Sequence, residues 1–492
     1  MSHFEKNCIS LAISVLFLIF AAQIAFAENA EAPEPAYFDL PVTIDTIKVG
    51  ISFGDTAAVE VRLACENCDG YSLGYFDYSR SFHELFTVNL ADIVLRPDTG
   101  FTLNSGEDDE TVVGPWHLIL DDVFASFDDA NNAADGISDG FVGLIDGEYR
   151  VLAGSFPNSD DAELWLNGRD IQAQPFTGSE YSVLVTVPDT KQCVFIIDNG
   201  GKTKLALRKL SSDDAVSYCG NRYGGDFEVF RCNDKLTVVN YIGLEDYVKG
   251  VLPYEMIAAW PMEALKAQGA CARTYVMNNI GSYYSDGFDV RNDTYSQVYK
   301  GMTGTAESTD IAAEATKGEY VRYKGLLCRI YYMSSDGGAT ASSADVFAQR
   351  RAYLSGIIDD SEDDLDFYNK TWCSVLREST VVRHFNENGA TLKDIQALTA
   401  TRSDTGIVIK LEAADSKGNT GVLCGQDCFI ELGLNSLNFE VTELPDDLWE
   451  FSGKGWGHNC GMSQWGAYAM ARDLNADCAK IIDHYFTGAY IR

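Results

Sequence analysis

The segment that most constrains the fold runs from residue 260 to residue 275, because its pattern requires a helix with neighbours on several sides. It opens with Trp260 and Pro261, and proline is favoured in the first turn of a helix. Small side chains recur along it at Ala264, Ala267, Gly269, Ala270 and Ala272. Such residues let another element approach the backbone closely. We therefore expect a central, buried helix.

A shorter helix precedes this segment. Residues 244–251 carry apolar side chains three and four positions apart, and Pro253 is expected to end the helix. Glu255 follows, between the two predicted helices and among apolar neighbours. Apolar surroundings favour the neutral form of a carboxyl group, which raises its pKa and suits it to donate a proton near neutral pH. The alternative is a Glu on the outer side of a turn with no chemical role.

Two charged residues of the longer helix, Lys266 and Arg273, are seven positions apart and therefore share one face. Charges on a helix usually form a solvated face. The rest of this helix is so apolar that a pair directed toward a functional site is an equally good interpretation. The sequence leaves both interpretations open.

The charge balance restricts the partners of the chain. Its 492 residues, enough for roughly three domains, include 37 Lys and Arg against 73 Asp and Glu, a net charge of −36. This excludes nucleic acid, because binding phosphates requires clustered cations. The acidic residues are dense from residue 97 to 170, where Arg150 and Arg169 are the basic residues, and we expect a solvated surface there. A hydrophobic content of 46% predicts a globular protein.

The N-terminus predicts export from the cytoplasm. Lys6 precedes an apolar run at residues 9–22, and the small residues around Ala27 are typical of a signal-peptidase site. We interpret residues 1–27 as a signal peptide and residues 28–45 as a linker, which makes the mature protein secreted. A retained membrane anchor is the alternative, but it would need about 20 apolar residues.

The cysteines agree with an oxidising compartment. Thirteen are present, and removal of Cys8 with the signal peptide leaves an even number that can pair. Two close pairs, Cys65 with Cys68 and Cys424 with Cys428, are expected to be local disulfides rather than zinc ligands, because the histidines lack zinc-site spacing. The remaining pairing cannot be deduced from sequence.

Residues 148–165 predict a strand, a turn and a helix that opens with acidic residues. This segment resembles the start of a SPOR-like repeat, which implies binding to bare peptidoglycan glycan; a generic strand–helix unit is the alternative. We expect residues 46–178 to form a smaller, acidic α/β domain of this kind.

Five blocks of sequence resemble, in order, the sporulation protein D and LytB (SpoIID/LytB) family. They are residues 244–256, 260–275, 293–299, 334–340 and 455–467. The resemblance covers about residues 180–492, and it implies a mixed α+β catalytic domain at residues 179–492.

The family implies a peptidoglycan lytic transglycosylase that cuts between N-acetylmuramic acid and N-acetylglucosamine in glycan strands stripped of stem peptides. Glu255 matches its catalytic residue. One carboxylic acid suffices for such a reaction, because the 6-hydroxyl of the sugar replaces water as the nucleophile. A hydrolase needs a second carboxylate, and Asp336 is the candidate that leaves hydrolysis open.

Substrate-binding roles are expected for ten residues of these blocks. Amides and hydroxyls can bind sugar hydroxyls, glycines permit close approach of the backbone, and a lone histidine either contacts substrate or has a structural role. Aromatic residues such as Trp465 can stack on sugar faces, although large aromatics are more often core residues. The ten are Lys266, Gln268, Arg273, Tyr275, Gln297, Ser335, Gly337, Gly338, His458 and Gln464.

No cofactor or metal is expected. Some family members bind zinc through His and Cys near the block at residues 293–299, but residues 285–302 contain neither. Two other functions remain as alternatives. One is a non-catalytic wall-binding protein that enhances an amidase. The other is a cysteine amidase using Cys460 and His458, which is disfavoured because a nucleophile and its base normally come from separate elements.

Overall fold

The structure is a computed structural model that describes residues 44–104, 110–211 and 215–492. The predicted signal peptide and most of the predicted linker lie outside these residues. The described chain forms two compact units. The N-terminal unit comprises Ile44–Val251 and Asn279–Gly304, and the C-terminal unit comprises Leu252–Asn278 and Thr305–Arg492. No helix in the described ranges has the length and hydropathy needed to cross a membrane.

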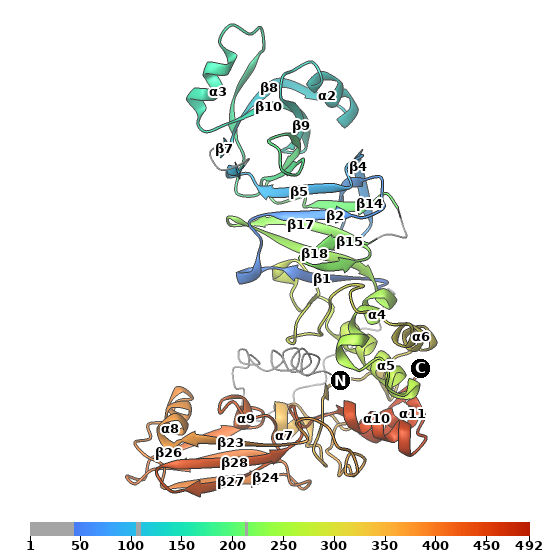
Figure 1. The fold of residues 1–492 in the computed structure, drawn as a ribbon, viewed down its shortest axis with the longest axis vertical. Coiled ribbons are helices and arrows are strands. Elements are labelled where there is room, and N and C mark those ends of the chain that lie inside the picture. The colour runs from blue at the N-terminus through green and yellow to red at the C-terminus, as the bar shows by residue number, and fades with distance from the viewer. Residues whose placement is uncertain (1–43, 105–109, 212–214) are drawn as a thin grey trace. The chain divides into compact units, whose positions relative to one another are not determined.

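The N-terminal unit contains a seven-stranded sheet (Figure 1). Its pairs are antiparallel, apart from the parallel pair β19 and β1. The order is β19 (Val290–Arg291), β1 (Thr46–Ser52), β18 (Lys235–Gly243), β17 (Asp226–Cys232), β14 (Leu205–Lys209), β3 (Tyr71–Phe76) and β4 (Phe82–Val88).

A ten-stranded sheet is the second layer of this unit. Its order is β11 (Ala173–Thr177), β8 (Trp116–Phe124), β10 (Glu148–Phe156), β9 (Gly140–Ile145), β13 (Cys193–Asp198), β12 (Val183–Thr186), β5 (Asp92–Pro97), β2 (Val61–Cys65), β15 (Val216–Tyr218) and β16 (Asn221–Tyr223). A separate hairpin joins β6 (Phe101–Asn104) to β7 (Glu110–Val113), and two 3-10 turns are η1 (Gly54–Thr56) and η2 (Tyr284–Asp286).

Part of the ten-stranded sheet is a βαββαβ module in the ferredoxin-like order. The chain passes through β8, α2 (Phe127–Ala134), β9, β10, α3 (Ser159–Leu166) and β11, and these strands lie in the order β11-β8-β10-β9. Both helices begin at a side chain that accepts a hydrogen bond from the first turn, Ser126 for α2 and Asn158 for α3. The predicted strand and helix at residues 148–165 are confirmed, and the SPOR-like assignment stays a prediction.

Both faces of the module are buried. On the helix side, Leu118 and Ala153 pack with Ala162 of α3. On the opposite side, apolar residues of the module pack with residues of neighbouring strands β12 and β13: Ile119, Phe141, Ile145 and Leu152 with Leu184 and Ile196. Residue 178, the predicted boundary of the acidic domain, lies between β11 and β12 of this one sheet. The division of the chain into a wall-binding and a catalytic part stays a prediction.

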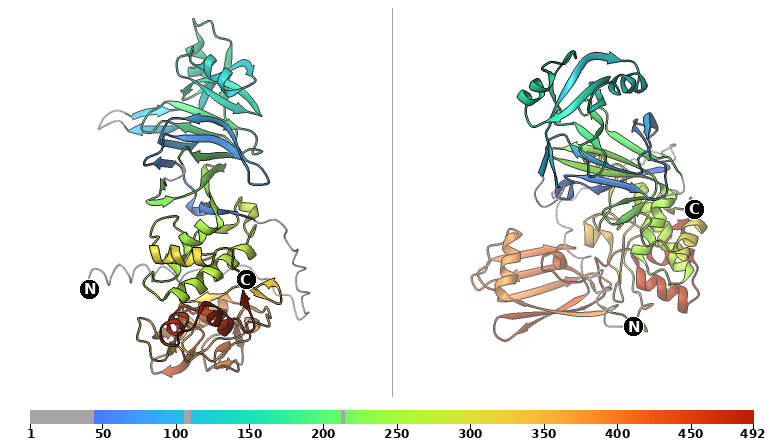
Figure 2. Two further views of the ribbon diagram at one scale, coloured as in Figure 1. Left: turned by 90° about the vertical axis from the view of Figure 1, so that its right-hand side faces the viewer. Right: turned by 45° about the horizontal axis from the view of Figure 1, so that its top comes forward.

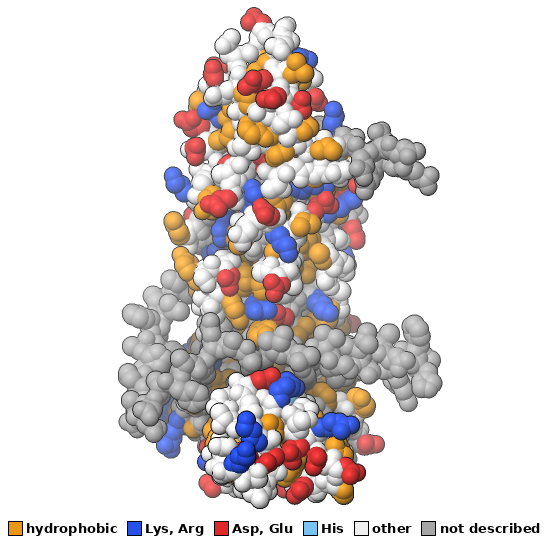
Figure 3. All heavy atoms as spheres, turned by 90° about the vertical axis from the view of Figure 1, so that its left-hand side faces the viewer, with side chains coloured by type: hydrophobic (Ala, Val, Ile, Leu, Met, Phe, Trp, Pro, Cys, Tyr) orange, Lys and Arg blue, Asp and Glu red, His pale blue; other side chains and the backbone are white. Residues whose placement is uncertain are grey.

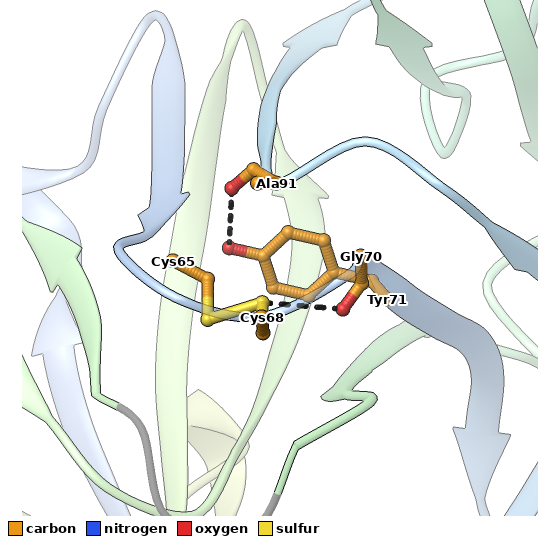
Figure 4. Close-up of a disulfide and its surroundings, with 5 residues drawn as sticks. All are labelled: Cys65, Cys68, Gly70, Tyr71 and Ala91. Atoms are coloured by element: carbon orange, nitrogen blue, oxygen red, sulfur yellow. Dashed lines mark hydrogen bonds between the residues drawn. A yellow bond between two sulfur atoms is a disulfide. The ribbon is translucent and has the colours of Figure 1, made fainter.

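A local disulfide joins Cys65 to Cys68, as predicted (Figure 4). The Cα atoms of these residues are 5.7 Å apart, and the hydroxyl of nearby Tyr71 donates to the carbonyl oxygen of Ala91. The second predicted pair is not joined. The Cys428 thiol instead donates to the Leu423 carbonyl oxygen at 3.3 Å, because its place in a short helix directs it toward that backbone group, and Cys424 is exposed.

The C-terminal unit is built around α5 (Met262–Asn278), which confirms the predicted central helix. Most of its side chains are buried, and α6 (Glu307–Ala315), α10 (Gln464–Asp473) and α11 (Cys478–Tyr485) pack against it (Figures 1 and 2). At Gly269 a side-chain carbon would lie 3.3 Å from the Thr316 hydroxyl. The small side chains therefore allow the close packing that the sequence predicts.

The predicted end of the preceding helix is wrong. α4 (Leu244–Glu255) continues through Pro253 and includes Glu255. Proline lacks an N–H and disturbs a helix at its own position, but the backbone N–H of Met256 still donates to the Leu252 carbonyl oxygen at 2.9 Å. That bond closes one more turn after the proline. The last turn of α4, from Leu252, belongs to the C-terminal unit.

Small sheets and short helices complete this unit, whose mixture of elements confirms the α+β class. The sheets are β23 (Thr371–Arg377), β28 (Leu448–Lys454) and β27 (Phe439–Leu444); β24 (Ala397–Arg402), β25 (Val408–Ala414) and β26 (Thr420–Cys424); β21 (Leu326–Leu327), β20 (Val321–Tyr323) and β30 (Tyr490–Ile491); and β22 (Tyr332–Met333) with β29 (Met462–Ser463). The remaining helices are α7 (Ser343–Phe347), α8 (Glu378–Glu387) and α9 (Asp427–Ile430).

Acidic residues of the segment 97–170 lie on the surface. On the face drawn in Figure 3, Asp and Glu side chains are scattered among uncharged ones. The interpretation as a solvated surface is confirmed for the described residues, with Asp98 as the buried exception. The exposed ones are Asp121, Asp122, Asp128, Asp129, Asp135, Asp139, Asp146, Glu148, Asp160, Asp161, Glu163 and Asp170.

Asp98 forms a buried pair with His117 of β8. The His117 Nε2 atom is 3.1 Å from Asp98 Oδ1, and Nδ1 is 2.7 Å from the Gly154 carbonyl oxygen. Burial by itself lowers the pKa of His117, but the hydrogen bond to Asp98 and the charge of that carboxylate outweigh it and raise the pKa above its usual value.

We predict that the pair makes the N-terminal unit less stable as pH rises. A histidine whose pKa is higher in the folded state contributes stability in full below its unfolded pKa of about 6.5 and loses it as pH rises through the folded pKa. His117→Ala should cost about 3 to 5 kcal/mol, since it leaves a buried charge unpaired. It should also flatten the pH dependence of the free energy of unfolding, measured in urea with hydrogen exchange of the β8 amides as the probe.

His83→Ala is the matched control for this prediction. His83 pairs with Asp77 at 2.8 Å, but both side chains are partly exposed to solvent, so the change should cost less than about 1 kcal/mol. An unchanged pH dependence in His117→Ala would contradict the assignment.

Candidate functional site

Glu255 is the last residue of α4 and is half-buried. Its neighbour Met256 is buried, Ile257 is exposed, and a turn closed by the Trp260 N–H and the Ile257 carbonyl oxygen leads to Pro261 and α5. The sequence therefore correctly places Glu255 at the junction of two helices. A carboxyl group at such a junction can reach a ligand while part of it is shielded from water.

The N-terminus of α10 contacts this junction. The side-chain amide of Gln464, the first residue of α10, donates to Glu255 Oε2 at 3.3 Å. The two residues are 209 positions apart. Among the predicted site residues, Gln464 is thus brought directly to Glu255.

An aromatic cluster lies beside this contact. The ring of Trp260 is 4.7 Å from that of Trp465 and 5.0 Å from that of Tyr468, and Phe367 stacks on Trp465 at 4.4 Å. All four rings are half-buried. The sequence leaves open whether Trp465 stacks on sugars or belongs to the core, and a role for Phe367 could not be predicted, because its segment has no recognisable pattern.

Two of the sequence blocks, residues 334–340 and 455–467, are joined by hydrogen bonds and close backbone packing. Ser335 and Trp456 exchange two backbone hydrogen bonds, and the Asn459 side-chain amide donates to the Asp336 carbonyl oxygen at 2.7 Å. Gly337 has a φ of 68°, and a side-chain carbon there would lie 2.6 Å from the Lys454 backbone. The glycine therefore permits one block to approach the other.

Asp336, the expected second carboxylate, is fully buried. Its Oδ1 accepts a hydrogen bond from the Gly338 N–H at 2.9 Å. Burial first, and then the charges of Glu362 and Asp359, raise the pKa of Asp336 well above its usual value. A buried carboxyl group that favours its protonated form is poorly suited to activate water, which weighs against hydrolysis.

His458 and Cys460 do not form a catalytic pair. The Cys460 thiol is fully buried, and burial raises its pKa, whereas a nucleophile needs the thiolate. Burial also lowers the pKa of His458 to about 4. The rings of Tyr331 and Phe347 contact the imidazole edge-on, and its Nδ1 accepts the Cys460 N–H at 3.1 Å. These contacts indicate a structural role.

The predicted charged pair of α5 is separated. Lys266 is half-buried and bonds Glu263 of the same helix at 2.8 Å. Arg273 is fully buried, and its guanidinium donates to the carbonyl oxygens of Ala313 at 3.1 Å and Glu319 at 3.3 Å. Because Arg273 binds α6 and the loop after it, its side chain points into the protein.

The remaining predicted residues lie in varied surroundings. Gln268 is fully buried and its amide has no hydrogen-bond partner among the described residues, while Tyr275 is half-buried on α5. Gln297 belongs to the N-terminal unit, where it is buried and accepts the Tyr247 hydroxyl at 3.1 Å. Ser335 is buried and donates to Glu362 at 2.5 Å. Their substrate roles stay predictions.

A metal site is not evident. No group of three or more His, Cys, Asp or Glu side chains suited to a metal ion occurs within residues 44–104, 110–211 and 215–492. Two cavities lie in the N-terminal unit, and Glu255 lines neither of them.

Comparison with known proteins identifies the family. The sequence profile of a family described as Stage II sporulation protein matches residues 232–323. An uncharacterized protein of Brachyspira hyodysenteriae is 34% identical over 287 residues, which cover 57% of this chain and 75% of that protein.

Two relatives from Bacillus subtilis carry functional names. The amidase enhancer is 28% identical over 392 residues, covering 64% of this chain and 53% of the enhancer, so the chain spans about half the length of that relative. Stage II sporulation protein D is 28% identical over 268 residues, covering 51% of this chain and 75% of the relative. With the five blocks in order and Glu255 beside Gln464, the chain belongs to the SpoIID/LytB family.

Proposed function

We propose that this protein is a secreted peptidoglycan lytic transglycosylase in which Glu255 is the general acid and base. The observation that carries the proposal is the half-buried carboxyl group of Glu255 at the junction of α4 and α5, where the Gln464 amide donates a hydrogen bond to one of its oxygens. The proposed substrate is a glycan strand stripped of stem peptides. The bond cut joins N-acetylmuramic acid to N-acetylglucosamine.

The reaction needs one carboxyl group. Protonated Glu255 donates its proton to the leaving glycosidic oxygen, and the resulting carboxylate accepts the proton of the muramic acid 6-hydroxyl as that oxygen attacks C1. The glycosidic bond breaks, a 1,6-anhydro ring forms and Glu255 ends in its starting protonation state. The nucleophile belongs to the substrate, so proximity favours ring closure over attack by water.

Gln464 and the aromatic cluster have distinct proposed roles. The Gln464 amide donates to the charged form of Glu255, which stabilises the carboxylate left after the first proton transfer. The rings of Trp260, Trp465 and Tyr468 offer apolar faces on which sugar rings can stack. The acidic N-terminal region is proposed to bind the wall and keep the enzyme on its substrate.

A second candidate function is the enhancement of a cell-wall amidase without cleavage of glycan. The observation that favours it is the similarity to a protein named amidase enhancer. In this case the same surface would bind glycan and present an amidase partner to the wall. Digestion of bare glycan by the purified protein, with and without an amidase, separates the two functions.

We predict that Glu255→Gln abolishes glycan cleavage and leaves the fold intact. The amide keeps the shape of the side chain but transfers no proton, and general acid–base catalysis contributes about 10² to 10⁴ in rate. Turnover of bare glycan is the measurement. The control is Glu263→Gln, because Glu263 is also half-buried but pairs with Lys266. Near wild-type turnover in Glu255→Gln would remove this residue from the mechanism.

The products should end in 1,6-anhydro-N-acetylmuramic acid. Hydrolysis would instead add water and give reducing ends about 18 mass units heavier. Mass spectrometry of the digest distinguishes them. Because Asp336 is buried, we expect Asp336→Asn to retain anhydro products, and reducing ends from the wild-type enzyme would contradict the single-acid mechanism.

Chelation should leave activity unchanged. Structural and catalytic zinc requires several spaced His, Cys or acidic ligands, which the described residues do not gather. Turnover is compared before and after treatment with EDTA, together with metal analysis of the protein. A stoichiometric metal lost together with activity would overturn this expectation.

A further inference from the structure

Glu362 is a buried carboxylate outside all five sequence blocks. It lies in the connection between α7 and β23 and is 1% exposed. A buried carboxyl group is costly unless hydrogen bonds satisfy its oxygens. The partners of Glu362 therefore indicate what it does.

Three hydrogen bonds converge on Glu362 from two blocks. The Ser335 hydroxyl donates to Oε2 at 2.5 Å, and the Asp336 N–H donates to Oε1 at 3.3 Å. The Ser463 hydroxyl also donates to Oε1. One carboxylate thus binds the block at residues 334–340 and the block at residues 455–467.

Ser463 connects this carboxylate to the candidate site. It is the N-cap of α10, and its Oγ accepts the Gly466 N–H at 3.1 Å. The next residue, Gln464, donates to Glu255 Oε2. The contacts run from Glu362 through Ser463 and the first turn of α10 to Gln464 and Glu255, all within the C-terminal unit.

We propose that Glu362 is a positioning residue for Glu255: by binding Ser463 it holds the start of α10 where the Gln464 amide meets the Glu255 carboxyl group. This inference rests on the proposed function of Glu255. Glu362 acts through other residues and has no contact with the substrate in this mechanism. A carboxylate is required because its two oxygens accept both serine hydroxyls, whereas an amide offers one acceptor oxygen and an NH₂ donor.

The test is Glu362→Gln in the full-length protein, with kcat, KM and pH dependence measured on bare glycan. We expect kcat to fall about 10- to 100-fold, the range found when the side chains that orient metal ligands are removed, with KM little changed. The alkaline limb of kcat/KM should move to higher pH. The sign follows because losing the Gln464 donor disfavours the charged form of Glu255, which must be protonated to act as the acid.

Ser463→Ala tests the same link if Glu362→Gln fails to fold. It should lower kcat and move the alkaline limb in the same direction. Its matched control is Ser342→Ala, which removes an N-cap of the same kind from α7, where Ser342 accepts the Asp345 N–H. That control should leave kcat and the pH profile unchanged.

Asp415→Asn is the control for loss of a buried carboxylate. Asp415 is 2% exposed and accepts backbone N–H groups of Lys417 and Asn419 at the turn between β25 and β26. None of its hydrogen bonds involves α10. We expect it to lower stability without moving the pH profile.

Hydrogen exchange separates failure of this inference from failure of the proposed function. In Glu362→Gln, the amides of the first turn of α10 should exchange faster than in the wild type, whether or not the protein cuts glycan. If the wild-type protein does not cleave bare glycan, the proposed function is refuted. Hydrogen exchange would still test whether Glu362 holds the start of α10 in place. Wild-type kcat, pH profile and exchange in a folded Glu362→Gln would overturn the inference.

Discussion

The burial of α5 is the constraint on which the C-terminal unit depends. Its small side chains let α6, α10 and α11 pack against one axis, so Gln464, 209 positions from Glu255 in the sequence, can be brought to its carboxyl group. Arg273 reinforces this arrangement by binding carbonyl oxygens of α6 and the following loop from the centre of the unit. The geometry of the candidate site therefore depends on the packing of α5 with α6, α10 and α11. A substitution in that core would be expected to disturb the site as well.

Local pattern was sufficient to predict part of this arrangement. The helix at α5 and the position of Glu255 follow from periodicity and proline placement within some thirty residues. The same pattern could not predict the direction of the Arg273 side chain. A charged residue in an apolar helix can face either a ligand or buried backbone carbonyl groups, such as those of Ala313 and Glu319. The helix end at Pro253 was predicted wrongly because helical hydrogen bonding resumes after the proline, where the Met256 N–H donates to the Leu252 carbonyl oxygen.

Residues in irregular segments could not be predicted. Glu362 and Phe367 lie in a connection without periodicity, and each acquires its role through contacts with residues about a hundred positions away, Ser463 and Trp465. The sequence blocks contain one partner of each contact, Ser463 or Trp465. The other partner, Glu362 or Phe367, lies outside every block. Long-range side-chain bonds of this kind become visible when the fold places the segments together, and a single sequence carries no signal for them.

The βαββαβ module has a consequence for attempts to shorten the chain. It shares its sheet with β13, which pairs in parallel with β9, and the apolar side chains of Leu184 and Ile196 pack on the face of the module. Removing residues 116–177 would leave β13 as an edge strand with unpaired backbone groups and an uncovered apolar face. Such an edge is a template for association with other chains, so a shortened protein would be expected to aggregate for a reason unrelated to its chemistry.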